Sequence, residues 1–299
     1  MNPKNIKDIV NLRDCDYIID KQDRFWIVHG FDSIKSLIYA NLVFIPCKSG
    51  DRYNKIINKN YKKVVVNHQN ISILKINSVK SVFRPDKFFK ENYSILPLIW
   101  KKIPRALIKL GIPKNKIGIF GSYLIGFDIV KDVDFLVYGF DNYLKVRRNI
   151  NRIRAFVNAK PISKKHITYQ YNKYNHFMSN KTSFKKVLAN NWAGLQMSEG
   201  VLSTIRFVYN LNKLPKDNTL KRGKLKTFEG QVIKDFRTNF MPRIGFIKCD
   251  DKIIRVLSYF WMLNSFLKIG DKIKIRGDYN LKNRTLYLKN KKHWIKILN

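Results

Sequence analysis

The segment 116–139 constrains the fold of this chain more than any other stretch of it. Its sequence, KIGIFGSYLIGFDIVKDVDFLVYG, predicts an apolar strand, a Gly-Ser turn, a short helical bridge and a second strand. The second strand carries Asp132 and Asp134. Because residues two apart on a strand project from the same face, we expect the two carboxylates to lie side by side. A glycine turn and an acidic pair therefore belong to one supersecondary unit.

This unit has the chemistry of a nucleotide- and metal-binding site. Two neighbouring carboxylates repel each other unless a cation lies between them, and Mg²⁺ is suited to one or two carboxylates plus substrate phosphates. Gly121 and Ser122, at the junction of strand and helix, would offer backbone N–H groups and a hydroxyl to phosphate oxygens. The sequence therefore predicts nucleotidyl transfer from a nucleoside triphosphate (NTP), with Asp132 and Asp134 as catalytic metal ligands and Gly121 and Ser122 as nucleotide-binding residues.

The same residues resemble a known family. Gly121-Ser122, then Gly126, then Asp132-Val133-Asp134 in a hydrophobic strand resemble the signature of the DNA polymerase β-like nucleotidyltransferase superfamily. The wider layout is similar to predicted microbial nucleotidyltransferases in which a β-rich part precedes the transferase core and an OB-like tail follows it. The resemblance implies that Ser122 and the glycines hold the triphosphate, while Asp132 and Asp134 bind one or two Mg²⁺ ions.

The sequence departs from the family pattern at the third carboxylate. The superfamily usually carries this acid on a neighbouring strand, one helix downstream, where it ligates metal and helps to deprotonate the attacking hydroxyl. The strand expected in that place, 164–171, contains His166 but no acid, and the next acid is Glu199. The turn also lacks the arginine that often follows the serine. The sequence thus leaves open whether the core is active or only a scaffold.

The charge of the chain indicates a polyanionic partner. Lys and Arg outnumber Asp and Glu by 59 to 21, which gives a formal net charge of +38. Such a charge favours nucleic acid or an anionic membrane. No apolar run reaches the roughly 18–20 residues of a spanning helix, so we expect nucleic acid, RNA or a single strand in particular, and no membrane. Because many lysines accompany Asn and Ile, a biased genome is an alternative source of the charge.

We expect an α+β fold in three parts, because strands and helices alternate in the middle of the chain. The parts are a β-rich N-terminal domain (1–77), a nucleotidyltransferase core (78–218) and an OB-like, nucleic-acid-binding β-barrel (224–299). The N-terminal part is rich in acids, which we expect to be solvated or to face substrate. In the core, helices are predicted over 141–158, 183–191 and 202–211.

Two groups of residues are candidates to hold nucleic acid. The first is the basic helix 141–158, whose apolar face is predicted to include Ile153 and Phe156; its arginines would contact RNA or form a solvated surface. These arginines are Arg147, Arg148, Arg152 and Arg154. The second group comprises aromatic side chains of the barrel, which would stack on bases or belong to the core. These are Phe240, Tyr259, Phe260 and Trp261.

The cysteines and the N-terminus predict a cytoplasmic protein. Cys15, Cys47 and Cys249 are widely separated and show no C-x-x-C spacing, so we expect neither a disulfide framework nor a zinc site. The first residues contain no apolar signal core.

Three hypotheses for the function remain open. The first is an active nucleotidyltransferase that acts on nucleic acid, and the second is a nucleic-acid-binding protein that retains a degenerate transferase core. The third is a nucleotidyltransferase for a small molecule or a protein, with which a net charge of +38 agrees poorly.

Overall fold

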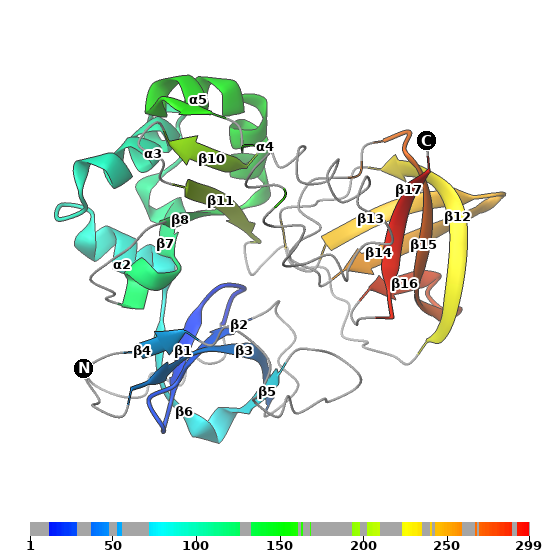
Figure 1. Ribbon diagram of the computed structural model, residues 1–299, viewed down its shortest axis with the longest axis horizontal. Coiled ribbons are helices and arrows are strands. Elements are labelled where there is room, and N and C mark those ends of the chain that lie inside the picture. Colours follow the sequence, from blue (N-terminus) through cyan, green and yellow to red (C-terminus); the bar gives the residue numbers. More distant parts are fainter. Residues whose placement is uncertain are drawn as a thin grey trace. The chain divides into compact units, whose positions relative to one another are not determined.

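The computed structural model shown in Figure 1 is a mixed α/β structure rich in strands. It divides into two compact units, residues 1–148 with 207–216, and residues 149–206 with 217–299. None of its described helices is long and apolar enough to cross a membrane. The structure describes residues 12–28, 37–47, 53–55, 72–125, 133–160, 163, 168, 193–197, 202–209, 223–234, 240, 243–258, 267, 269–288 and 292–298.

An antiparallel sheet forms the N-terminal part, where the sequence predicts a β-rich region. Its strand order is β4-β3-β2-β1-β6, and β5 also pairs with β3. Successive side chains of a strand point to opposite faces. Tyr17 and Ile18 of β1 accordingly enter two different apolar clusters, so both faces of the sheet carry buried apolar side chains. The strands are β1 (Tyr17–Asp20), β2 (Phe25–Val28), β3 (Leu37–Pro46), β4 (Tyr53–Lys55), β5 (Ser72–Lys75) and β6 (Val79–Phe83).

A second sheet contains the two strands predicted in segment 116–139. Its order is β7-β8-β11-β10-β9, and β7 and β8 are antiparallel. A single turn of 3-10 helix, η3 (Ser122–Ile125), follows β7. The predicted strand, turn and strand are confirmed, except that residues 126–132 lie outside the described part. The strands are β7 (Ile117–Phe120), β8 (Asp134–Tyr138), β9 (Ala159–Lys160), β10 (Gly194–Met197) and β11 (Leu202–Val208).

Four α-helices accompany these strands in the described residues. They are α2 (Pro85–Asn92), α3 (Leu98–Lys109), α4 (Phe140–Arg148) and α5 (Ile150–Val157). The single helix predicted over 141–158 is therefore wrong, because Asn149 leaves the helical conformation and becomes the N-cap of α5. Ile153 is buried as predicted, whereas Phe156 is 43% exposed.

The helix predicted over 202–211 is also wrong, since Leu202–Val208 is the strand β11. Ser203, Ile205 and Phe207 are buried and alternate with less buried residues, which is the period of a strand. Branched and aromatic side chains favour this conformation. The helix predicted over 183–191 lies outside the described residues.

The C-terminal part is a closed five-stranded β-barrel, consistent with an OB-like barrel. The strands close in the order β12-β13-β14-β16-β15-β12, and β17 also pairs with β15. β14 and β16 are parallel, and the other pairs are antiparallel. The strands are β12 (Lys224–Lys234), β13 (Arg243–Cys249), β14 (Lys252–Ser258), β15 (Lys272–Asn280), β16 (Thr285–Leu288) and β17 (Trp294–Leu298).

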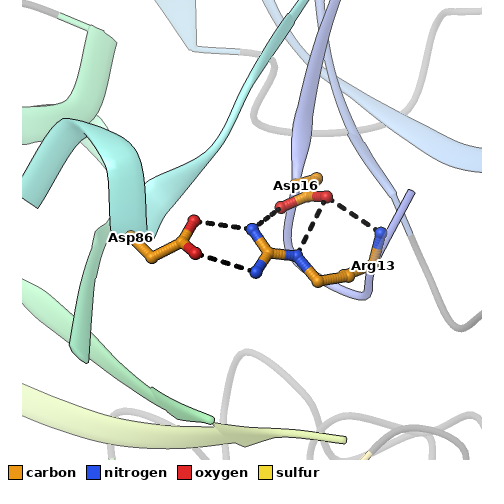
Figure 2. A network of polar contacts seen from close by, with 3 residues as sticks. All are labelled: Arg13, Asp16 and Asp86. Carbon is orange, nitrogen blue, oxygen red and sulfur yellow. Dashed lines mark hydrogen bonds and ion pairs between the residues drawn. The ribbon is translucent and has the colours of Figure 1, made fainter. Parts of the chain in front are cut away.

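A buried ion-pair network joins the N-terminal sheet to α2 (Figure 2). Arg13 Nη1 and Nη2 donate to the two carboxylate oxygens of Asp86, at 2.9 and 2.6 Å. Arg13 Nη2 also donates to Asp16 Oδ1 at 3.2 Å, and the backbone N–H of Arg13 donates to Asp16 Oδ2 at 2.9 Å. The guanidinium carbon lies 4.6 Å from the ring centroid of Tyr138, the last residue of β8. One cation thus joins its own segment to two others that are distant in sequence.

Three of the four described acids of the N-terminal part are buried, not solvated as expected. Asp14, Asp16 and Asp20 are buried, and Asp16 has no exposed surface. Asp20 accepts hydrogen bonds from the backbone N–H groups of Gln22 and Arg24, from Arg24 Nε and from Trp26 Nε1. These carboxylates are fixed inside the fold because a buried charge needs partners.

Replacing Arg13 by alanine should destabilise the first unit by about 3–5 kcal/mol, because it leaves the buried Asp16 and the half-buried Asp86 without their cation. The matched control is Lys80→Ala, which breaks an ion pair with Asp23 whose side chains are 54% and 49% exposed. That control should cost less than about 1 kcal/mol. Urea unfolding of the full chain measures both, and equal losses would contradict this role of Arg13.

The stability of the first unit should also depend on the protonation of Asp16. Burial raises the pKa of Asp16 from 3.8 to about 6, against the opposing charge and hydrogen bonds of Arg13. Between these values the folded state binds more protons than the unfolded state, so the free energy of unfolding should fall as the pH rises from about 4 to about 6.

Asp16→Asn should remove this part of the pH dependence, which amounts to at most about 3 kcal/mol. Urea unfolding of both proteins between about pH 4 and about pH 7 measures the difference. Parallel curves for the wild type and Asp16→Asn across that window would show that Asp16 titrates as in an unfolded chain.

Candidate functional site

The pairing of β7 with β8 brings the glycine turn next to Asp134. Phe120, the last residue of β7, lies opposite Asp134, the first residue of β8. Gly121 and Ser122 follow Phe120 directly and therefore begin beside that carboxylate. A Cβ atom built on Gly121 would lie 4.0 Å from Asp134 Oδ2. The structure thus brings together Gly121, Ser122 and Asp134.

The turn has a backbone shape that favours glycine. Gly121 has φ +93°, which side-chain-bearing residues rarely adopt. Its carbonyl accepts a hydrogen bond from Leu124 N–H at 3.2 Å, which closes the first turn of η3. Leu124 is buried in the apolar cluster that also contains Phe120 and Leu136. The turn is therefore anchored by the core, while Ser122 stays half-buried beside it.

Asp134 has a defined place on β8. Its neighbours Val133 and Phe135 have no exposed surface, whereas Asp134 is half-buried. The second predicted carboxylate, Asp132, lies outside the described residues, as does Gly126. Among the described residues, no group of three or more His, Cys, Asp or Glu side chains is placed to hold a metal ion. The metal-binding role of Asp132 and Asp134 stays a prediction.

The strand next to β8 differs from the one expected from the sequence. In the sheet order that strand is β11, and the backbone N–H of Gly139 donates to the carbonyl of Val208 at 2.8 Å. Leu202–Val208 contains no carboxylate. Of the expected strand 164–171 only Thr168 is described, and Glu199 lies outside the described residues. The position expected for a third acid is thus occupied, in the described part, by an acid-free strand.

The start of α2, which includes Asp86 of the ion-pair network, packs against β7. A Cβ atom on Gly118 of β7 would lie 3.0 Å from the backbone nitrogen of Asp86, so the start of α2 approaches β7 closely. Asp86 is held by Arg13, and Arg13 covers Tyr138 of β8. The network therefore contacts α2, which packs against β7, and Tyr138 of β8, so it touches the surroundings of both strands that form the candidate site. The sequence analysis missed this network. The signal it offered was the segment LRDCD, in which two closely spaced acids follow an arginine.

The outer surface of β13 and β14 combines cations with an aromatic ring. We call this the β13–β14 face; Ile247 and Ile254 point into the barrel core from the opposite side of the same strands. Phe246 lies opposite Arg255, and Lys234 Nζ is 5.5 Å from the Phe246 ring centroid. The residues of the β13–β14 face are Lys234, Phe246, Lys248, Ile253 and Arg255.

The aromatic candidates chosen from the sequence do not form this face. Phe240 has no exposed surface, so of the two alternatives it is a core residue and does not stack on bases. Tyr259, Phe260 and Trp261 lie outside the described residues. Phe246 was missed because its segment, RIGFIKC, reads only as an apolar strand until the burial of Ile247 shows which side faces outward.

The predicted arginine cluster is divided between α4 and α5. Arg147 and Arg148 belong to α4, and Arg152 and Arg154 belong to α5. Arg147 Nη1 donates to the hydroxyl of Tyr143 at 3.1 Å. Burial lowers the pKa of Arg154. Their contact with RNA stays a prediction.

Substitution of Gly121 should disturb the turn through backbone strain rather than through crowding. Gly121→Ala should cost about 1–2 kcal/mol, because the 4.0 Å spacing accommodates a methyl group but φ +93° does not suit it. Gly121→Asn should cost less and Gly121→Val more, since asparagine tolerates positive φ best among the three. Amide hydrogen exchange in β7 and β8 measures the series. Equal effects of all three would contradict this account of the turn.

Comparison with protein-family models, curated proteins and solved structures finds no match to this chain. A proposal for its function therefore rests on the chemistry of its own residues, above all on the turn at Gly121 and Ser122 beside Asp134.

Proposed function

We propose that this chain is a Mg²⁺-dependent nucleotidyltransferase with a polymerase-β-like core and an OB-like nucleic-acid-binding barrel. It would add a nucleotide from an NTP to a hydroxyl of a nucleic acid, RNA or a single strand in particular. The observation that carries the proposal is the register of β7 and β8, which sets the Gly121–Ser122 turn beside Asp134.

The residues of the turn and of β8 fit a metal and a triphosphate. Asp134 offers carboxylate oxygens, which Mg²⁺ prefers, and the missing side chain of Gly121 leaves space in front of them. Asp134 and Asp132 would hold Mg²⁺, which would supply charge neutralisation at the phosphates. Gly121 and Ser122 would hold the phosphates through N–H groups and the hydroxyl.

The reaction would be a substitution at the α-phosphorus of the NTP. The hydroxyl oxygen of the nucleic acid forms a bond to that phosphorus, the bond to the β-phosphate oxygen breaks, and pyrophosphate leaves. The hydroxyl proton passes to water or to a nearby base. The chain itself would orient the two reactants and stabilise the negative charge of the phosphates.

Nucleic acid as the acceptor is supported by the charge and by the barrel. The net charge of +38 favours a polyanion. On the β13–β14 face, Phe246 could stack on a base while Lys248 and Arg255 contact phosphates, which is the usual combination in single-strand binding.

A second function is favoured by the acid-free strand next to β8. If no third carboxylate completes the site, the chain would bind nucleic acid and retain the transferase core as a scaffold. A transferase for a small molecule or a protein would instead form product without nucleic acid, and the charge argues against it.

Asp134→Asn should abolish nucleotide transfer, with a loss of about 100-fold or more, because it removes a carboxylate that would hold the Mg²⁺ that neutralises the reacting phosphates. The matched control is Asp141→Asn, which changes an exposed acid in the first turn of α4 and should leave transfer unchanged. Full-length protein is incubated with labelled NTPs, Mg²⁺ and RNA, single-stranded DNA or no acceptor, and product is measured on gels.

Each outcome separates the candidates. Transfer to RNA or DNA that is lost in Asp134→Asn and kept in Asp141→Asn supports the proposed enzyme. Tight binding of RNA without transfer, unchanged in Asp134→Asn, supports the scaffold function. Product without any acceptor indicates transfer to a small molecule or to the protein itself.

A further inference from the structure

The barrel carries a second row of cations, on the outer side of β15. Ile273 and Ile275 of β15 are buried in the barrel core. Because side chains alternate along a strand, Lys272, Lys274 and Arg276 point to the opposite, outer side. Neighbouring cations are two positions apart in sequence, so they recur about every 6.6–6.8 Å along one line.

The row continues onto β17, the strand that pairs with β15 outside the closed barrel. Figure 1 shows β15 between β12 and β17. Lys296 lies opposite Lys274, and Trp294 lies opposite Arg276. Ile295 is buried in the barrel core, so its neighbours Trp294 and Lys296 face outward with the β15 cations. We call these five residues the β15 face: Lys272, Lys274, Arg276, Trp294 and Lys296.

The charges on the β15 face are only partly balanced. Glu229 of β12 lies opposite Lys274, with Lys274 Nζ 3.9 Å from Glu229 Oε2. Asp278 occupies the next outward position of β15. Its Oδ1 is hydrogen-bonded to His293 Nε2 at 3.2 Å. Two acids therefore stand beside four cations on this side of the barrel.

The strand pairing does not place further acids beside these cations. Among the described strands, Lys272 lies between Gln231 and Leu298. Arg276 lies between Thr227 and Trp294.

Lys274 and Lys296 oppose each other across the two strands. Like charges directly opposite in a sheet destabilise it. The pair Lys274–Lys296 is such an arrangement, only partly relieved by Glu229 on the other side of Lys274. A bound anion would remove the repulsion. The repulsion between Lys274 and Lys296 makes an anionic partner a better explanation of this surface than solvation alone.

We propose that the β15 face binds the phosphodiester backbone of a single-stranded nucleic acid, with Trp294 stacked on a base. The spacing of the cations is close to the interval between phosphates of an extended strand, and the half-buried Trp294 offers a rigid ring beside them. β13 and β14 take no part in this face. The barrel would therefore present two separate contact surfaces to a single-stranded nucleic acid. The inference rests on the proposed nucleic-acid partner and names a surface that holds it.

Binding of a fluorescent, unstructured single strand of about 16 nucleotides to the full-length protein tests the proposal. The test variant is Lys272→Gln/Arg276→Gln/Lys296→Gln, which leaves the Lys274–Glu229 pair intact. The matched control is Lys252→Gln/Lys282→Gln/Arg284→Gln, which removes the same charge from exposed positions at the start of β14 and in the β15–β16 turn. A third variant, Lys234→Gln/Lys248→Gln/Arg255→Gln, reports on the β13–β14 face.

The test variant should bind about 10-fold more weakly than the control at about 0.1 M salt. The slope of log affinity against log salt should become shallower by about 2, the value for three lost phosphate contacts. Trp294→Leu should weaken oligonucleotide binding by about 10-fold and leave binding of heparin, a polyanion without bases, unchanged. Equal losses for heparin and the oligonucleotide would overturn the stacking role of Trp294.

Equal affinities and salt slopes for the test variant and the control would overturn the proposal. If only the β13–β14 variant loses affinity, nucleic acid remains the partner and the β15 face is not its site. If the wild type binds no oligonucleotide, the nucleic-acid partner of the proposed function fails as well. Vesicles with about one-third anionic lipid serve as a comparison. A loss confined to vesicle binding would overturn the proposal in favour of a membrane surface. Oligonucleotide binding is measured without NTP, so a failure of nucleotide transfer leaves this result intact.

Discussion

The first unit depends on one buried cation. Arg13 binds Asp86 through two parallel hydrogen bonds, binds Asp16 beside it and covers the ring of Tyr138. Buried ions are costly unless their geometry satisfies them, so the loop before β1, the start of α2 and the end of β8 are specified together. β7, which α2 approaches at Gly118, and β8 are the two strands that set Gly121 beside Asp134. The Arg13 network thus packs against both strands that position the candidate site.

The acids held inside the fold add to the basic character of the surface, where lysine and arginine predominate. Asp14, Asp16 and Asp20 are buried, and Asp86 is engaged by Arg13. Carboxylates held in this way do not offset the lysines and arginines of the surface locally, although they count in the net charge of +38. On the barrel, the β13–β14 face and the β15 face each place cations around one aromatic ring. Under the proposed function, this arrangement would attract a polyanion over long distances and contact it directly at short range.

The sequence predicted those parts of the fold that local pattern decides. The strand, the glycine turn and the second strand of 116–139 follow from apolar runs and from Gly121, and the β-barrel follows from short strands separated by turns. The helix predicted over 202–211 is wrong because Leu202–Val208 is the strand β11, a conformation that pairing with the neighbouring strands decides. The Arg13 network and the outward side of Phe246 depend on contacts between distant segments, which residue order alone does not reveal. Of the candidate site, the turn and Asp134 are placed together, while β11, the described strand next to β8, holds no carboxylate.

A crystal structure with Mg²⁺ and a non-hydrolysable NTP analogue tests the central claim most directly, because it locates the triphosphate without requiring turnover. The account predicts that the triphosphate lies against the backbone of Gly121 and Ser122, with a metal ion bound by Asp134 and Asp132. A nucleotide bound elsewhere, or a turn that stays empty at saturating Mg²⁺ and nucleotide, would contradict it.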